Sequence, residues 1–452
     1  MKKIVLSTLT ALSIATVASA ADVKLYQDAN GQVFTSAAEG RTELNIQPET
    51  KKKNSITIVD QNSPDFLLGK ETHINMKFVA DDNPDMWLKA GVRVQGTFQD
   101  QKTDYKATDT ATKFDKEVSD AYLRRVRFEV SAGFNKYTSF VMDVRNDKAN
   151  YQDVGEESFN VGDAYVQIKK PFDTSLVNFK LYRAKIDVSR TETIKSAHTL
   201  HYDRPTVADE AAQFITHNRR GTNAQMFGDW NKKVHYQVAF GDGTYSGAFS
   251  DATGAKLAKS TFEQSSFFYG GKVLLSPFDG WEEKEKTETY FGEGQHFSIG
   301  AAYWNSPDIS YKSTSTGAAT TKINHELINF EISAHYKGLM AQAEYFHFNG
   351  VVKNFAVAGQ GELGSSNGWY ATSEYVFKDL SYIAPFVRYE SWNKYNDQAG
   401  YDFTSKIAGL NWYLKGNSIK AGIAYQQDEY GSKLKDGERT VSTLKLTSQF
   451  FF

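Results

Sequence analysis

The sequence lacks cysteine altogether, has only 8 prolines in 452 residues, and carries no long apolar run beyond its N-terminal segment. Without cysteine there are no disulfides and no thiolate metal ligands. A membrane-spanning helix needs about 20 consecutive apolar residues, and the rest of the chain offers none. The formal net charge is −2, and we expect no nucleic-acid partner. There is no nucleotide-binding loop or histidine-rich helix, so we expect no cofactor and no metal.

Aromatic residues, in contrast, are plentiful, with 31 phenylalanines and 25 tyrosines. Aromatic-rich, proline-poor segments favour β-strands. A mean hydropathy of −0.51 fits strands that alternate a lipid-facing apolar residue with a polar residue facing an aqueous lumen. The composition therefore favours an all-β chain and is compatible with a transmembrane antiparallel β-barrel.

Both ends of the chain carry features of exported proteins. Lys2 and Lys3 make a positive start, residues 4–17 are mostly apolar, and residues 18–20 form an A-x-A cleavage site. Together they predict a signal peptide at residues 1–20 that is removed on export. The chain closes on three phenylalanines, the last being Phe452, and this resembles the C-terminal signal of bacterial outer-membrane β-barrels. We therefore expect the mature protein in the lipid of the bacterial outer membrane.

Sixteen strand-like segments can be counted from alternation and turn residues. They begin near Met86, Val118, Tyr137, Ser158, Ser175, Gly221, Lys233, Ser265, Gly294, Lys322, Gly338, Ser366, Leu380, Asp402, Asn417 and Arg439. This count predicts a β-barrel of about 16 strands over residues 85–452. Residues 21–84 are polar, and we expect them to form an N-terminal periplasmic leader or a plug-like segment.

The connections between these segments alternate in length. Short ones, such as residues 134–136 and 172–174, alternate with long polar ones, such as residues 188–220 and 243–264. Short periplasmic turns and long external loops are the connectivity of outer-membrane barrels. One connection breaks the rule, because residues 277–293 should be a short turn and are not. The strand count is open to a change of about two at that point.

Alternation of side-chain character is visible within single segments. Arg125, Arg127 and Glu129 share one face of their segment, and Arg124 is the charged exception on the other face. A soluble β-sandwich also alternates in this way. The export features and the alternating connection lengths favour the barrel.

Basic residues are concentrated between the second segment and the loop that follows the fifth. A row of cationic groups facing a narrow lumen attracts anions and passes them between sites, and arginine binds oxyanions through paired hydrogen bonds. The candidates for such an anion pathway are Arg125, Arg127, Arg145, Arg183, Lys185, Arg190, Lys195, Arg204, Arg219 and Arg220. Acidic residues in the same region leave an alternative, in which mixed charges pair across the barrel and produce little selectivity.

Residues 178–190 resemble a strand of the phosphate-selective porin O and P family that reads close to N-L-R-V-G-Q-F-K-x-P-F-S-R-E. Lys185 and Arg190 match this pattern, whereas Tyr182 and Asp187 replace its glycine and proline. Further stretches that resemble strands of this family are residues 163–166, 219–226 and 236–243. The resemblance implies a sixteen-stranded trimeric channel with basic residues along an anion path. By the count of connections, the basic loop after the fifth segment is the third external loop, which in many porins folds inward and constricts the channel.

The sequence therefore favours an outer-membrane porin that passes small hydrophilic solutes, prefers anions such as phosphate and, by the resemblance, forms a homotrimer. One alternative is a non-specific diffusion porin with paired lumen charges. Another is a barrel that serves as an adhesin or structural protein. A barrel hydrolase comes last, because no serine–histidine or carboxylate centre stands out. We expect no enzymatic activity.

Overall fold

The computed structural model describes residues 25–28, 33–34, 37–44, 56–59, 75–80, 83–106, 115–149, 151, 158–216, 219–244, 250–258, 260–283, 286–312, 322–355 and 363–451. It comprises two units, residues 1–54 and residues 55–452. The predicted signal peptide and Phe452 lie outside the described residues. Among the described residues, no helix is long and apolar enough to cross a lipid bilayer.

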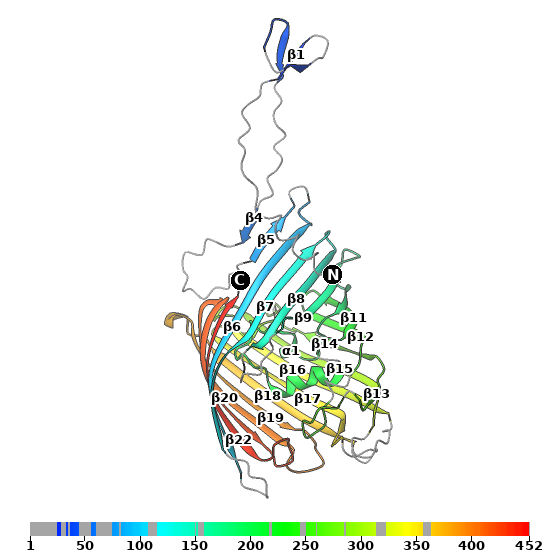
Figure 1. Cartoon of the computed structure of the whole chain (residues 1–452), viewed down its shortest axis with the longest axis vertical. Helices are drawn as coiled ribbons and strands as arrows, with labels where there is room; N and C mark the ends of the chain where they lie inside the picture. Colours follow the sequence, from blue (N-terminus) through cyan, green and yellow to red (C-terminus); the bar gives the residue numbers. More distant parts are fainter. Residues whose placement is uncertain are drawn as a thin grey trace. The chain divides into compact units, whose positions relative to one another are not determined.

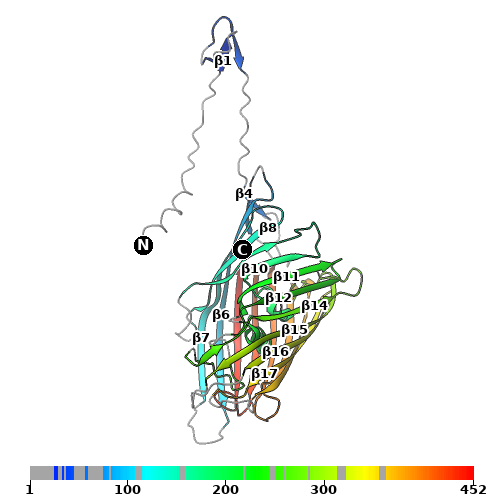
Figure 2. The ribbon, with the colours of Figure 1, turned by 90° about the vertical axis from the view of Figure 1, so that its right-hand side faces the viewer.

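In the second unit, sixteen antiparallel strands within the described residues close into one barrel (Figure 1 and Figure 2). Each strand pairs with its neighbours along the chain, and the last pairs with the first, with Phe451 opposite Arg93. The strands are β6 (Trp87–Tyr105), β7 (Lys116–Gly133), β8 (Thr138–Ala149), β9 (Asn160–Ile168), β10 (Asn178–Arg183), β11 (Thr222–Trp230), β12 (Val234–Gly241), β14 (Phe268–Leu275), β15 (Gln295–Tyr311), β16 (Ile323–Tyr336), β17 (Leu339–Val352), β18 (Leu363–Tyr375), β19 (Ile383–Asn393), β20 (Asp402–Asn417), β21 (Ile419–Tyr430) and β22 (Arg439–Phe451). The predicted fold class and strand count are confirmed, and each predicted start lies within three residues of an observed one.

Several shorter strands lie outside this ring. β13 (Phe262–Gln264) pairs with the end of β15. β4 (Ile56–Val59) and β5 (Asn75–Val79) form an antiparallel pair, and β5 also pairs with the first four residues of β6. In the first unit, β1 (Leu25–Asp28) pairs with β2 (Val33–Phe34) and β3 (Arg41–Leu44). The role expected for residues 21–84, a leader or a plug, stays a prediction.

The strands alternate inward and outward side chains, as barrel geometry requires. On β17, Gln342 and Glu344 are buried inside the barrel, whereas Leu339 and Tyr345 are exposed on its outer face. Large apolar side chains therefore cover the outside, where lipid solvates them, and polar side chains line the interior.

A β-bulge in β7 changes one detail of the predicted alternation. Consecutive residues of β6 pair with Arg125 and Leu123, so Arg124 is an extra residue in β7. A bulge of this kind shifts the alternation by one position. Arg124 and Arg125 therefore both turn inward, and Arg124 forms an ion pair with Asp203 inside the barrel. The prediction that Arg124 lies on the opposite face is wrong for this reason.

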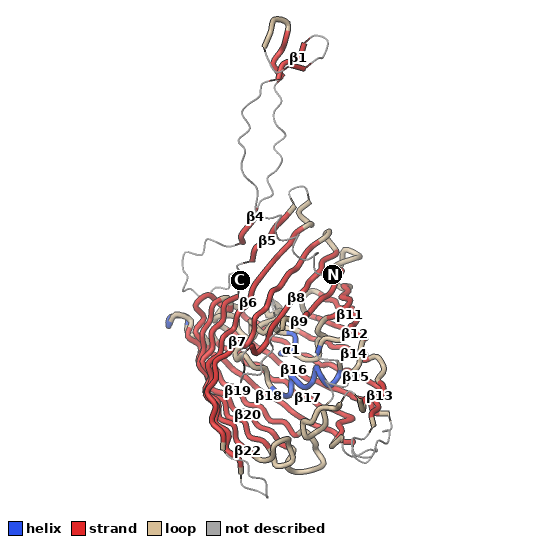
Figure 3. The backbone as a smooth tube through the Cα atoms, in the orientation of Figure 1, coloured by secondary structure: helices blue, strands red, loops and turns tan. Residues whose placement is uncertain are grey.

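The loop between β10 and β11, residues 184–221, folds into the barrel and is named L3. It contains helices α1 (Arg190–Thr193) and α2 (Thr206–Ile215), which Figure 3 draws within the ring of strands. α2 packs its apolar side against β15–β19, and Val207, Ala208 and Ala211 are fully buried there. The apolar packing of α2 holds L3 inside the lumen.

Carboxylates of the barrel wall bind the N-termini of both helices of L3. Glu390 of β19 accepts hydrogen bonds from the backbone N–H groups of Thr206 and Val207, at 2.9 and 2.6 Å. Glu344 of β17 accepts from the N–H groups of Arg190 and Thr191, at 3.0 and 2.9 Å. The first N–H groups of a helix have no partner within the helix and carry partial positive charge, so these carboxylates fix the two helices against the wall.

The connection that the sequence left open, between β14 and β15, is one long turn. Residues 276–294 contain no strand where they are described, and several of them contact L3 inside the barrel. We name this segment the inner turn.

Candidate functional site

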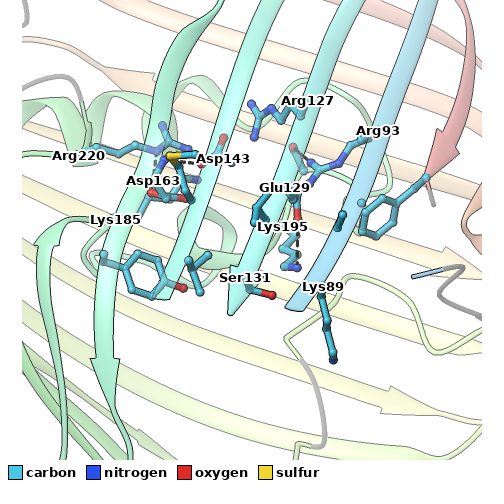
Figure 4. Close-up of a pocket in the computed structure, with 18 of the residues that line it drawn as sticks. Lys89, Arg93, Arg127, Glu129, Ser131, Asp143, Asp163, Lys185, Lys195 and Arg220 are labelled. Atoms are coloured by element: carbon cyan, nitrogen blue, oxygen red, sulfur yellow. Dashed lines mark hydrogen bonds and ion pairs between the residues drawn. The ribbon is translucent and has the colours of Figure 1, made fainter. Parts of the chain in front are cut away.

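A cavity of about 410 Å³ lies between L3 and the wall formed by β6–β9. Its charged lining residues on the wall come from inward positions of these strands, which places their side chains in adjacent rows. Figure 4 shows the labelled side chains between the strands and L3. The charged groups at the lining are Lys89, Arg93, Arg127, Glu129, Asp143, Asp163, Lys185, Lys195 and Arg220.

Positive charge outweighs negative charge at this lining, with six cationic and three acidic side chains. Glu129 pairs closely with Arg93 and lies 3.6 Å from the Nζ of Lys195. Arg220 donates from Nε to Asp163 at 2.9 Å. These acids therefore hold particular cations in place, but the three of them at the lining do not neutralise its six positive charges. An excess of cations in a confined polar space raises the local concentration of anions.

Four of the ten predicted pathway residues line this cavity, namely Arg127, Lys185, Lys195 and Arg220. Arg127 donates from Nη2 to both carboxylate oxygens of Asp147, at 3.2 and 2.9 Å. Of these four residues, Lys195 is the most open to water, because 59% of its side-chain surface is exposed. The structure thus brings wall and loop cations together at one place.

Three predicted residues on the wall lie outside the cavity lining. Arg125 donates to the backbone carbonyl of Tyr202 in L3 at 2.9 Å. Arg183 donates to the carbonyl of Gly162 at 2.8 Å. Arg145 lies 3.9 Å from the Oδ2 of Asp147. Arg125 therefore helps to seat L3 on the wall, and Arg183 joins β10 to β9.

Glu192 forms ion pairs with three cations of L3. Lys185 lies 3.1 Å and Arg204 lies 3.9 Å from its carboxylate oxygens, and Arg219 forms the closest ion pair. Burial raises the pKa of Glu192, but Arg219, Lys185 and Arg204 outweigh burial and hold this pKa below its usual range. Arg204 also donates to the carbonyl of Ile194 at 2.7 Å. Arg204 and Arg219 therefore fix the shape of L3.

Arg190 and Asp187 are both turned away from the cavity lining. Arg190 is 1% exposed and forms a two-pronged ion pair with Glu283 of the inner turn. Asp187, which replaces the family's proline, pairs with Lys272 at 2.8 Å and with Lys286. Two lysines thus neutralise the charge of Asp187.

Sequence reasoning missed Lys89 and Arg93, which line the cavity from β6. The signal was available, because Lys89, Gly91, Arg93 and Gln95 alternate with apolar residues and so share the inward face of β6.

Comparison with known proteins agrees with this architecture. The family model described as phosphate-selective porin O and P matches residues 89–452. No curated protein sequence matches the chain. Similar solved structures include the outer membrane channel DcaP of Acinetobacter baumannii, with a TM-score of 0.54 and 12% identity over 83% of this chain and 99% of that chain. The anion-selective porin from Comamonas acidovorans gives a TM-score of 0.53 and 8% identity over 81% and 99% of the two chains. Salmonella typhi OmpF, in its complex with daunomycin, gives 0.51 and 13% over 83% and 100%.

These structural likenesses show the fold alone, because each identity is low. The family match covers most of the chain and includes every strand of the closed barrel apart from the first two residues of β6. The chain therefore belongs to the phosphate-selective porin O and P family and is an outer-membrane porin, a channel rather than an enzyme.

Proposed function

We propose that this porin conducts small anions in preference to cations, and that phosphate is the class of anion it takes best. The observation that carries this proposal is the six-to-three excess of cations at the cavity between L3 and the β6–β9 wall. Three of those cations are arginines, whose planar forks match the oxygens of phosphate. Membership of a family described as phosphate-selective supports the same preference.

The proposed path runs along the cavity. Its cations are Lys89, Arg93, Arg127, Lys185, Lys195 and Arg220. The other predicted residues, Arg125, Arg145, Arg183, Arg190, Arg204 and Arg219, contribute to the field of the lumen or hold the wall and L3 in shape. Support for this division comes from their partners, because most of them bind carbonyl oxygens or buried carboxylates rather than face the cavity.

The placement of α2 supports a narrow passage on the β6–β9 side. α2 packs apolar side chains against β15–β19, and water-filled space is disfavoured within close apolar packing. The polar, positively charged lining lies on the other side of L3. Anions crossing the barrel would therefore meet the cations at short range, where their attraction is strongest.

A second candidate function, a non-specific diffusion porin, is favoured by the ion pairs that Glu129, Asp163 and Glu192 make with cations of the site. Single-channel chloride currents in planar bilayers, measured with increasing phosphate, separate the two. The proposal expects a saturable fall in chloride conductance as phosphate occupies the cationic path. A chloride current that is unaffected by phosphate would favour the non-specific porin.

We also propose that the porin is a homotrimer in the outer membrane and that residues 1–20 are removed on export. The family resemblance supports the trimer, and the signal-like N-terminus supports the cleavage. Cross-linking in native outer membranes should give a band of three chains, and N-terminal sequencing of that band should begin at Ala21. A band of single chains, or an N-terminus at Met1, would contradict the corresponding statement.

A further inference from the structure

The inner turn, residues 276–294, is far longer than other connections at the same end of the barrel, such as residues 231–233 and 337–338. Its start and end are anchored on aromatic side chains. Trp281 stacks on Tyr336 of β16, with ring centroids 5.6 Å apart and an interplanar angle of 10°. Contacts of this kind hold a turn in one position, which indicates that the inner turn is an ordered element.

The first contact between the inner turn and L3 is a buried ion pair. Arg190 of L3 donates from Nη1 and Nη2 to the two carboxylate oxygens of Glu283, at 3.1 and 2.6 Å. Both side chains are nearly buried, at 1% and 8% exposure. Arg190 also donates to the carbonyl of Thr287 at 3.1 Å. A two-pronged pair of this kind fixes both position and orientation.

The second contact involves Glu288. Its carboxylate accepts from the Oγ1 of Thr191 at 2.9 Å and from the backbone N–H of Leu200 at 2.6 Å. The backbone N–H of Glu288 donates to the carbonyl of His198 at 3.1 Å. Glu288 therefore binds two separate stretches of L3 at once.

The third contact is the ion pair between Lys286 and Asp187 at the start of L3. Asp187 also pairs with Lys272 on β14, at 2.8 Å. This arrangement links L3, the inner turn and the barrel wall through one buried carboxylate.

The inner turn also packs on the wall beyond L3. The ring of Tyr290 lies 4.2 Å from that of His335 on β16, and the ring of Phe291 lies 5.2 Å from that of Tyr413 on β20. In the order of the closed barrel, these strands lie away from β6–β9, where the cavity is. The inner turn thus fills space on the side of the lumen that the cavity does not use.

We propose that the inner turn is a second constriction element, which fixes L3 from the opposite end of the barrel and closes the β15–β20 side to solutes. Glu283 and Glu288 are its positioning residues, and they act through L3. Solutes then pass only along the cavity, and the size limit of the channel depends on the inner turn as well as on L3. This inference concerns solute size, so it stands or falls separately from the anion preference.

The test is the double variant Glu283→Gln/Glu288→Gln in the full-length porin. It removes the charges that bind L3 and changes little of the volume. The matched control is Glu282→Gln, on the same turn, for which no contact with the described residues of L3 is recorded. The measurement is the permeability of gluconate, a bulky anion, relative to chloride, from reversal potentials in planar bilayers. We expect the double variant to raise this ratio about threefold or more, because narrow pores discriminate by radius, and the control to leave it unchanged.

Loss of stability alone would lower the yield of folded barrel without changing this ratio in the barrels that do insert. If the double variant assembles poorly, Glu283→Asp keeps the charge, shortens the reach by one methylene and supplies the same comparison. An unchanged gluconate ratio in the assembled variant would overturn the proposal, as would an equal rise in the Glu282→Gln control. The sign of the wild-type reversal potential in potassium chloride tests the anion preference independently.

Discussion

Replacement of Lys195 by glutamine removes one of the six cations at the cavity and leaves the shape of the passage almost unchanged. The side chain of Lys195 is 59% exposed and lies 3.6 Å from Glu129. Glu129 keeps Arg93 as its close partner after the substitution. The variant therefore changes the electric field of the passage and does not break a buried ion pair.

The size of the effect follows from Coulomb's law. An ion passing roughly 7 Å from one unit charge in water gains or loses about 0.6 kcal/mol. Screening by about 0.1 M salt reduces this to about 0.3 kcal/mol. Loss of the cation makes the passage less favourable for an anion and more favourable for a cation by the same amount. The two changes sum to about 0.6 kcal/mol, so the anion-to-cation permeability ratio should fall about threefold.

Reversal potentials in planar bilayers under a potassium chloride gradient give this ratio directly. The matched control is Lys406→Gln, because Lys406 lies at an exposed position of β20 and pairs with Glu429 on the outer surface. Its ratio should equal that of the wild type. A Lys195→Gln ratio that does not differ from the control would refute the reasoning that the cavity cations set selectivity.

Three further predictions concern L3 and the wall. The pKa of Glu192 is depressed, so its ion pairs are complete above its ordinary pKa of about 4.3 and are lost as the pH falls through the lower folded value; the difference in selectivity between the wild type and Glu192→Gln should therefore be the same at about pH 8 and about pH 5, and a difference that disappears within that range would contradict this. Tyr182 adopts a φ of 84°, a left-handed conformation that costs a non-glycine residue about 1 kcal/mol, so Tyr182→Gly should raise the urea midpoint of unfolding slightly, and a clear fall would count against strain at this site. Ala211→Asp places a charge in the apolar packing of α2, which costs about 3 kcal/mol or more; the barrel should still assemble, but L3 should become sensitive to added protease, and a protected L3 would argue that α2 does not hold the loop.

The strands were predictable because their determinants are local. Alternation and turn residues located every strand start to within three residues, since each depends on neighbours in sequence. The bulge at Arg124 was not predictable in this way. It is defined by how β7 pairs with β6. The local pattern does not distinguish a bulge, which turns Arg124 inward, from a charged residue on the outward face.

The candidate site was predictable only in outline. The density of basic residues pointed to strands and to a loop that contribute to the cavity lining, and the pathway itself stays a prediction. The partners of these residues were not predictable, because Arg190 meets Glu283 across 93 positions of sequence and Arg204 meets backbone carbonyls whose positions depend on how L3 folds. Asp187 shows the same limit. Two lysines neutralise it, one from β14 and one from the inner turn, and both are distant from it in sequence.

The measurement that tests the central claim most directly is the zero-current potential of the purified wild-type porin across a planar bilayer with a potassium chloride gradient. The excess of cations between L3 and the β6–β9 wall predicts a sign that reports chloride as the more permeant ion. A potential near zero, or one with the sign of potassium selectivity, would contradict the claim that this cavity forms an anion path.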